Sequence, residues 1–136
     1  MKTQSHNTTV DDAIRSAFSI IEDLANEVRE VVDNAADTNF ASTQRIQTLE
    51  ETADTLEQHT EADVPDALQA IEVTVVTVVK RRQSRADRRD EACSYLAAVI
   101  DLLNEREDDT EAEELAGELQ EIQDEWEGAE FPGMYG

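Results

Sequence analysis

With 136 residues, 33 of them acidic and 11 basic, the chain carries a net charge of −22. This length suits one domain with its own hydrophobic core and is too short for two. The single cysteine, Cys93, excludes an internal disulfide and fits a reducing cytoplasm, where we expect the protein. The first ten residues are polar and do not resemble a signal peptide. No apolar run approaches the ~20 residues that span a bilayer, so we expect no membrane association.

The acidic surface indicates the environment in which this chain folds. In dilute buffer such a surface repels itself, which lowers the stability of the compact state. In molar salt the Debye length falls to about 3 Å, and most of that repulsion disappears. Among the basic residues only Lys2 and Lys80 are lysine. This composition resembles that of cytosolic proteins of salt-accumulating haloarchaea, among them their small, acidic, all-helical proteins. The resemblance implies a halophilic environment and no particular activity.

The N-terminal third of the chain contains the strongest helical pattern. Residues 1–8 are polar, and we expect a disordered leader there. Thr9 followed by Asp12 resembles a capping box and indicates a helix start near Val10. From there to Ala35, apolar residues recur at alternating intervals of four and three, which is a heptad seam. This pattern predicts an amphipathic helix over residues 10–36.

A second helix is predicted over residues 42–60, where Ile46, Leu49, Ala53 and Leu56 restore the same spacing. The intervening residues 36–44 are polar, weak helix formers without Gly or Pro. Two interpretations fit them. Either one helix continues with a four-residue stutter in its seam, or it breaks and Asn39 or Ser42 caps a new helix.

Residues 65–105 are predicted as one long helix, with Asp63 as its N-cap and Pro65 in its first turn. The segment VTVVTVV within it also fits a buried strand by propensity. No second β-rich run offers this segment a partner, so the helical interpretation is favoured. A last helix is predicted over 110–127, ended by Gly128.

The predicted fold is therefore all-α, a long antiparallel helical hairpin or helical bundle with coiled-coil-like heptad seams. A disordered leader (1–8) precedes a single helical domain (9–127), and an apolar tail (128–136) follows it. A helix of about 40 residues would be ~60 Å long, whereas the last helix would be ~25 Å long. The uncovered part of its apolar seam needs another chain, which predicts a homodimer.

An arginine-rich block interrupts the long predicted helix. At 100° per residue its arginines fall within an arc of roughly 120°. A hairpin turn near residue 62 would place the block opposite residues 36–44, within reach of Asp33 and Asp37. The favoured interpretation is an ion-paired polar layer, within one chain or across a dimer. A protein-partner surface comes next, and a nucleic-acid site is opposed by the net charge of −22 and the lack of aromatic residues. The arginines are Arg81, Arg82, Arg85, Arg88 and Arg89.

The sequence contains no recognisable catalytic motif, and we expect no catalytic, cofactor-binding or metal-binding residues. Carboxylate pairs such as Glu50 with Asp54 and Glu121 with Asp124 only partly match the pattern of magnesium-binding pyrophosphatases of the MazG type. Such pairs arise by chance in so acidic a chain.

The tail residues Phe131, Met134 and Tyr135 are apolar, and we expect the tail to dock, either on the end of the bundle or into a partner. Together these patterns favour a non-enzymatic protein-interaction or scaffold protein of a halophile, cytoplasmic and homodimeric. The alternatives are a nucleic-acid-associated regulator that uses the arginine face and a MazG-like metal-dependent nucleotide hydrolase.

Overall fold

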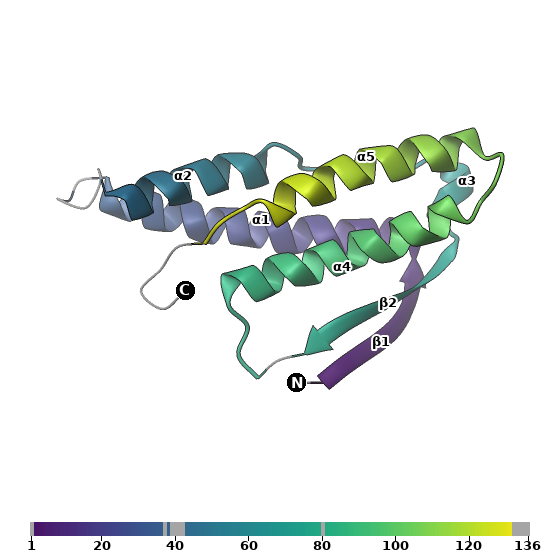
Figure 1. Ribbon diagram of the computed structural model, residues 1–136, viewed down its shortest axis with the longest axis horizontal. Coiled ribbons are helices and arrows are strands. Elements are labelled where there is room, and N and C mark those ends of the chain that lie inside the picture. The colour runs from purple at the N-terminus through teal and green to yellow at the C-terminus, as the bar shows by residue number, and fades with distance from the viewer. Residues whose placement is uncertain (1, 37, 39–42, 80, 132–136) are drawn as a thin grey trace.

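The computed structural model describes residues 2–36, 38, 43–79 and 81–131 (Figure 1). Along this part of the chain each of two strands is followed by two long helices, and the single-turn α3 lies between the two halves. The elements are β1 (Lys2–Thr9), α1 (Val10–Ala35), α2 (Gln44–Glu57), α3 (Asp66–Gln69), β2 (Glu72–Val79), α4 (Arg85–Asn104) and α5 (Thr110–Glu127).

The predicted helices at the two ends of the chain are confirmed. Helix α1 begins at Val10, where the Thr9 hydroxyl accepts a hydrogen bond from the Asp12 backbone N–H at 3.2 Å. Helix α5 ends at Glu127 with Gly128 as its C-cap, as predicted, and its N-cap is Asp109, whose carboxylate accepts from the Ala112 N–H at 3.1 Å.

The polar stretch after α1 is a break and not a stutter in a continuous helix. Helix α1 ends at Ala35, and α2 begins at Gln44 with Thr43 as its cap. The predicted caps Asn39 and Ser42 lie outside the described residues.

The prediction of an all-α fold is wrong, because residues 72–79 form a strand and not the middle of a long helix over 65–105. Strand β2 pairs antiparallel with β1, in a register that runs from Lys2 opposite Val79 to Thr9 opposite Glu72 (Figure 1). The first residues are therefore a strand and not a disordered leader. The partner strand escaped notice because it is polar, with the sequence KTQSHNTT. β1 can be polar because α4 packs mainly against β2: on the inner face of β1, Gln4 is exposed and His6 and Thr8 are only partly buried.

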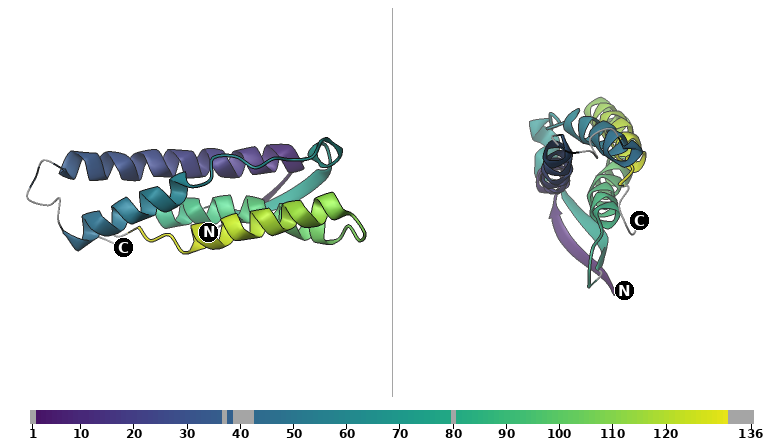
Figure 2. Two further views of the ribbon diagram at one scale, coloured as in Figure 1. Left: turned by 90° about the horizontal axis from the view of Figure 1, so that it is seen from above. Right: turned by 90° about the vertical axis from the view of Figure 1, so that its left-hand side faces the viewer.

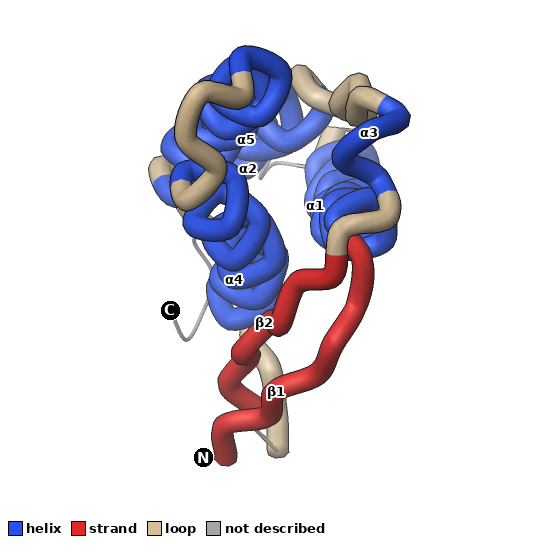
Figure 3. The backbone as a smooth tube through the Cα atoms, turned by 90° about the vertical axis from the view of Figure 1, so that its right-hand side faces the viewer, coloured by secondary structure: helices blue, strands red, loops and turns tan. Residues whose placement is uncertain are grey.

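Side chains along β2 alternate between the protein interior and solvent. Val73, Val75 and Thr77 point inward and are at most 6 % exposed. Val76 and Val78 point outward and are 51 % and 48 % exposed. A lone two-stranded antiparallel sheet is only marginally stable in water. The inner face of the β1–β2 sheet packs against α4 (Figure 3), which supplies the apolar cover that the sheet needs.

The helices bury their apolar seams against one another. Helix α1 packs against α2 and α4, and α4 packs against α5 (Figure 2). At the centre of the main core, the Trp126 ring meets the Phe18 ring edge to face, with 5.3 Å between their centroids. A smaller apolar cluster, which includes Val28 and Leu49, lies between α1 and α2.

None of the helices in the described ranges is both long and apolar enough to cross a membrane.

Two valines distinguish the observed strand from the predicted helix. On a helix with the predicted seam both Val75 and Val78 would face the core, whereas on β2 only Val75 does. We expect Val75→Ala to lower the free energy of unfolding by about 2–3 kcal/mol through lost burial and a cavity, and Val78→Ala by less than about 1 kcal/mol. Urea unfolding in molar KCl measures both. Equal losses would contradict the strand.

Candidate interaction surfaces

The arginine block divides into two groups in the structure. Arg81 and Arg82 lie in the segment between β2 and α4 and are exposed. Within the described ranges neither has an ion pair or a hydrogen-bonded side-chain partner. Arg85, Arg88 and Arg89 lie in the first turns of α4, and their side chains are partly buried. Ser84 holds this helix start through a complete capping box with Asp87.

Glu27 of α1 is the acidic partner of the first two helical arginines. It forms an ion pair with the Arg88 guanidinium, and the Arg85 Nε lies 3.7 Å from its Oε1. The predicted partners are not involved. Asp33 is exposed on α1 away from these contacts, and Asp37 lies outside the described residues. The predicted position of the arginine block, opposite residues 36–44, was wrong because it assumed a continuous helix. A helix rises ~1.5 Å per residue, whereas the strand found in its place rises ~3.3 Å per residue.

Arg89 holds the C-terminal segment against α4. Its Nη1 donates to the Ala129 carbonyl at 2.7 Å, and its guanidinium carbon lies 5.8 Å from the centre of the Phe131 ring. From α2, the Thr52 hydroxyl donates to the Glu130 carbonyl at 2.5 Å. Phe131 is half-buried and packs against both apolar clusters. Met134 and Tyr135, also predicted to dock, lie outside the described residues.

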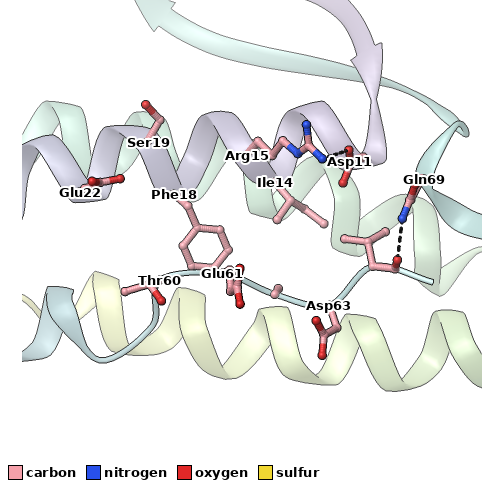
Figure 4. A pocket seen from close by; sticks show the side chains of 12 residues that line it. Asp11, Ile14, Arg15, Phe18, Ser19, Glu22, Thr60, Glu61, Asp63 and Gln69 are labelled. Carbon is pink, nitrogen blue, oxygen red and sulfur yellow. Dashed lines mark hydrogen bonds and ion pairs between the residues drawn. The ribbon is translucent and has the colours of Figure 1, made fainter. Parts of the chain in front are cut away.

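A groove of about 440 Å³ lies between α1 and the extended segment 58–65 (Figure 4). Phe18 points into it from α1. The charged side chains around it are mostly acidic, and Arg15, the one cation in its lining, is paired with Asp11 at 3.1 Å. The groove therefore offers an anionic ligand no free cationic group in its described lining.

The described residues bring no three His, Cys, Asp or Glu side chains together as a metal site. Of the carboxylates considered from sequence, Asp54 accepts from Arg29 at 2.7 Å, and Glu50, Glu121 and Asp124 are exposed. No observation here supports the MazG-like alternative.

The outer face of the β1–β2 sheet is the unusual surface of this molecule. We define it by the outward residues Thr3, Ser5, Asn7, Glu72, Thr74, Val76 and Val78. Val76 and Val78 are the large apolar side chains that the structure describes as exposed. Beside them the Thr74 hydroxyl donates to the Asn7 side-chain oxygen at 2.7 Å, which links the two strands on this face.

Apart from Glu72 at the start of β2, the two strands contain no acidic residue. Residues 1–10 and 73–86 contain five basic residues and no acidic ones, and the rest of the chain holds all 33 acidic residues with the other six basic ones. Strand pairing brings these two stretches side by side. Each acid-free stretch was visible in the sequence, but their adjacency required the pairing of β1 with β2.

Comparisons with protein-family models, with curated proteins and with solved structures find no match.

The thiol of Cys93 is predicted to be unreactive in the native protein. Cys93 is only 6 % exposed, and burial, with the nearby Glu127 carboxylate, raises the pKa of its thiol to about 12. In buffer near the ordinary thiol pKa of about 8.5, a disulfide reagent should react at least ~100-fold more slowly than in urea, because the thiolate is the nucleophile. Equal rates in both conditions would contradict this burial.

Removing the Arg89 side chain should loosen the C-terminal segment. Arg89→Ala loses the charge-assisted bond to Ala129 and the contact with Phe131, which we expect to cost about 1–2 kcal/mol of stability. Amide exchange at residues 129–131 should become faster while exchange in α1 changes little. Arg45→Ala on the exposed side of α2 is the control. Unchanged exchange at 129–131 would show that Arg89 does not hold the segment.

Proposed function

We propose that this chain is a non-enzymatic protein-interaction protein that acts as a homodimer through the outer face of its two-stranded β1–β2 sheet. The observation that carries the proposal is the exposure of Val76 and Val78 on a sheet of only two strands. Apolar side chains that adjoin on a sheet face are typical of a surface that is covered in use.

The proposed dimer interface lies on the β1–β2 sheet because the described helices leave no large apolar side chain exposed. Leu24, Leu96 and Leu119 on three different helices are fully buried within the chain. The reason for expecting a dimer from sequence, the uncovered seam of a long helix over 65–105, disappears with that helix. The exposed valines supply a different reason, independent of helix length.

The size of this face sets the strength of the proposed dimer. Two eight-residue strands give a face of roughly 27 by 10 Å. Stable interfaces bury about 800 Å² of accessible surface on each partner. The sheet face alone therefore supports a weak, reversible dimer. A tighter dimer requires additional contacts from the loops at both ends of the sheet.

The nucleic-acid alternative is less well supported. Arg85, Arg88 and Arg89 engage groups of their own chain, which leaves Arg81 and Arg82 as the described arginines of the block that could meet phosphates. No aromatic residue lies on the outer face to stack on bases.

We propose the cytoplasm of a salt-accumulating haloarchaeon as the environment of this dimer. The excess of acidic over basic residues, 33 against 11, and the single cysteine support it. Burial of Val76 and Val78 between two copies is strengthened by excluded salts, whereas the repulsion between two chains of charge −22 is screened.

Sedimentation equilibrium in molar KCl, from micromolar to millimolar protein, tests the proposed dimer. The natural chain should show a reversible monomer–dimer equilibrium. The double substitution Val76→Asp with Val78→Asp should make it monomeric, and Val76→Thr with Val78→Thr, which keeps the strand propensity, should weaken the dimer at least ~10-fold.

The matched control adds the same two charges elsewhere. Gly117→Asp lies on α5, where an added side chain meets no atom within 4 Å, and Gln44→Asp lies in the first turn of α2. This control should dimerise like the natural chain, and far-UV circular dichroism checks that every variant is folded. A natural chain that is monomeric at all concentrations, or aspartate variants that dimerise equally well, would refute the proposal.

A further inference from the structure

We infer that the β1–β2 sheets of two copies face each other with their strands antiparallel, so that the basic tip of each sheet lies over the acidic base of the other. The tip is Arg81 and Arg82, just beyond β2. The base is Glu72 at the start of β2 and Asp12 in the first turn of α1. This arrangement rests on the proposed homodimer and names its geometry and the residues that orient it.

The outward side chains of β2 follow one another in a row from the base to the tip. Glu72, Thr74, Val76 and Val78 alternate with the inward residues of β2, so they lie in one row. An exposed carboxylate is at one end of this row, two exposed valines lie past its middle, and two exposed arginines follow its other end. The face is thus charged with opposite sign at its two ends.

These charges lack partners among the described residues of their own chain. In the part of the chain that the structure describes, Glu72, Asp12, Arg81 and Arg82 make no ion pair. Six of the nine arginines do find a carboxylate, at Asp11, Glu27, Asp54, Glu57, Asp90 or Asp109. With 33 acidic residues in the chain, two adjacent arginines that are left free are well placed to pair with another molecule.

Two-fold symmetry constrains how two copies can meet. An interface between two identical copies uses the same patch twice, so the patch must complement itself. If the two-fold axis passes perpendicular to the strands between Val76 and Val78, each of these valines meets the other valine of the second copy. Glu72 lies about 17 Å from this axis, five residues of strand away. The arginines lie on the opposite side, so rotation places them over the base of the other copy.

The parallel arrangement has the opposite electrostatics. A two-fold axis along the strands would place the tip on the tip and the base on the base. Four arginines would then meet without a carboxylate between them, because residues 73–86 contain none. Like charges that face each other across an interface disfavour that partner orientation. The charges therefore set the orientation, while the valines supply the apolar contact.

The base also separates self-association from binding of an acidic protein or a nucleic acid. A polyanion would be attracted to Arg81 and Arg82 and repelled by Glu72. The substitution Glu72→Arg would then strengthen such binding, whereas it should weaken the homodimer, because it turns the base against the tip of the second copy.

A charge exchange tests the arrangement by sedimentation equilibrium, at the lowest salt at which the chain is folded. Glu72→Arg alone, and Arg81→Glu with Arg82→Glu, should each lower the association constant about 10-fold. These three substitutions combined with Asp12→Arg, which exchanges every charge of the tip and the base, should restore it to within about threefold of the natural value. In molar KCl all these differences should shrink because the charges are screened. Glu114→Arg on the exposed side of α5 is the control and should change nothing.

Crosslinking gives a second readout that does not depend on affinity. Chains with Glu72→Cys are mixed with chains that carry Arg81→Cys, and a bis-maleimide of about 10 Å is added, the separation of stacked sheets. The antiparallel arrangement predicts mixed products of Glu72→Cys with Arg81→Cys, and products of one variant with itself would overturn it. If the complete charge exchange fails to rescue while Val76→Asp with Val78→Asp still abolishes the dimer, the arrangement is wrong and the homodimer stands. A monomeric natural chain refutes both.

Discussion

The pairing of β1 with β2 is the contact on which the rest of the structure depends. It joins the first residues of the chain to a segment about half its length away, with Asn7 bonded to Thr74. At its base the Val10 N–H donates to the Ile71 carbonyl at 2.9 Å, which fixes the start of α1 beside the start of β2. Because α1 and α4 follow the two strands, this pairing also brings those helices together. The inner face of β2 then completes the core between them.

How far the fold could be predicted depends on how local each element is. Helix α1 follows from a heptad seam that one segment contains completely, and the helices over 44–57 and 110–127 follow in the same way. A strand pair belongs to two segments, and here one of them is polar. The spacing of Val75 and Val78 fits a helix seam equally well. Only the register shows that Val75 is inside and Val78 outside.

The candidate surfaces divide along the same line. The favoured interpretation of the arginine block was an ion-paired layer, within one chain or across a dimer. The structure pairs Arg88 with Glu27 of the same chain and not with Asp33, because a strand rises farther per residue than a helix and so changes which parts of α1 and α4 lie side by side. Phe131 docks against its own chain, which agrees with one of the two predicted alternatives. The outer face with Val76 and Val78 could not have been predicted, because the valines become exposed only when their neighbours Val75 and Thr77 are turned inward.

The order of the strands along the chain has a consequence for synthesis on the ribosome. At about 5 to 20 residues per second, the 67 positions from Asn7 to Thr74 take about 3 to 13 seconds to translate. During that time β1 is present without its partner. An unpaired strand edge promotes aggregation most when it is apolar, and the sequence of β1, KTQSHNTT, contains no apolar residue. The valine-rich strand emerges second, when its partner is already waiting. The polarity of β1 made the strand hard to recognise in the sequence. The same polarity protects it from aggregation before β2 has been synthesised.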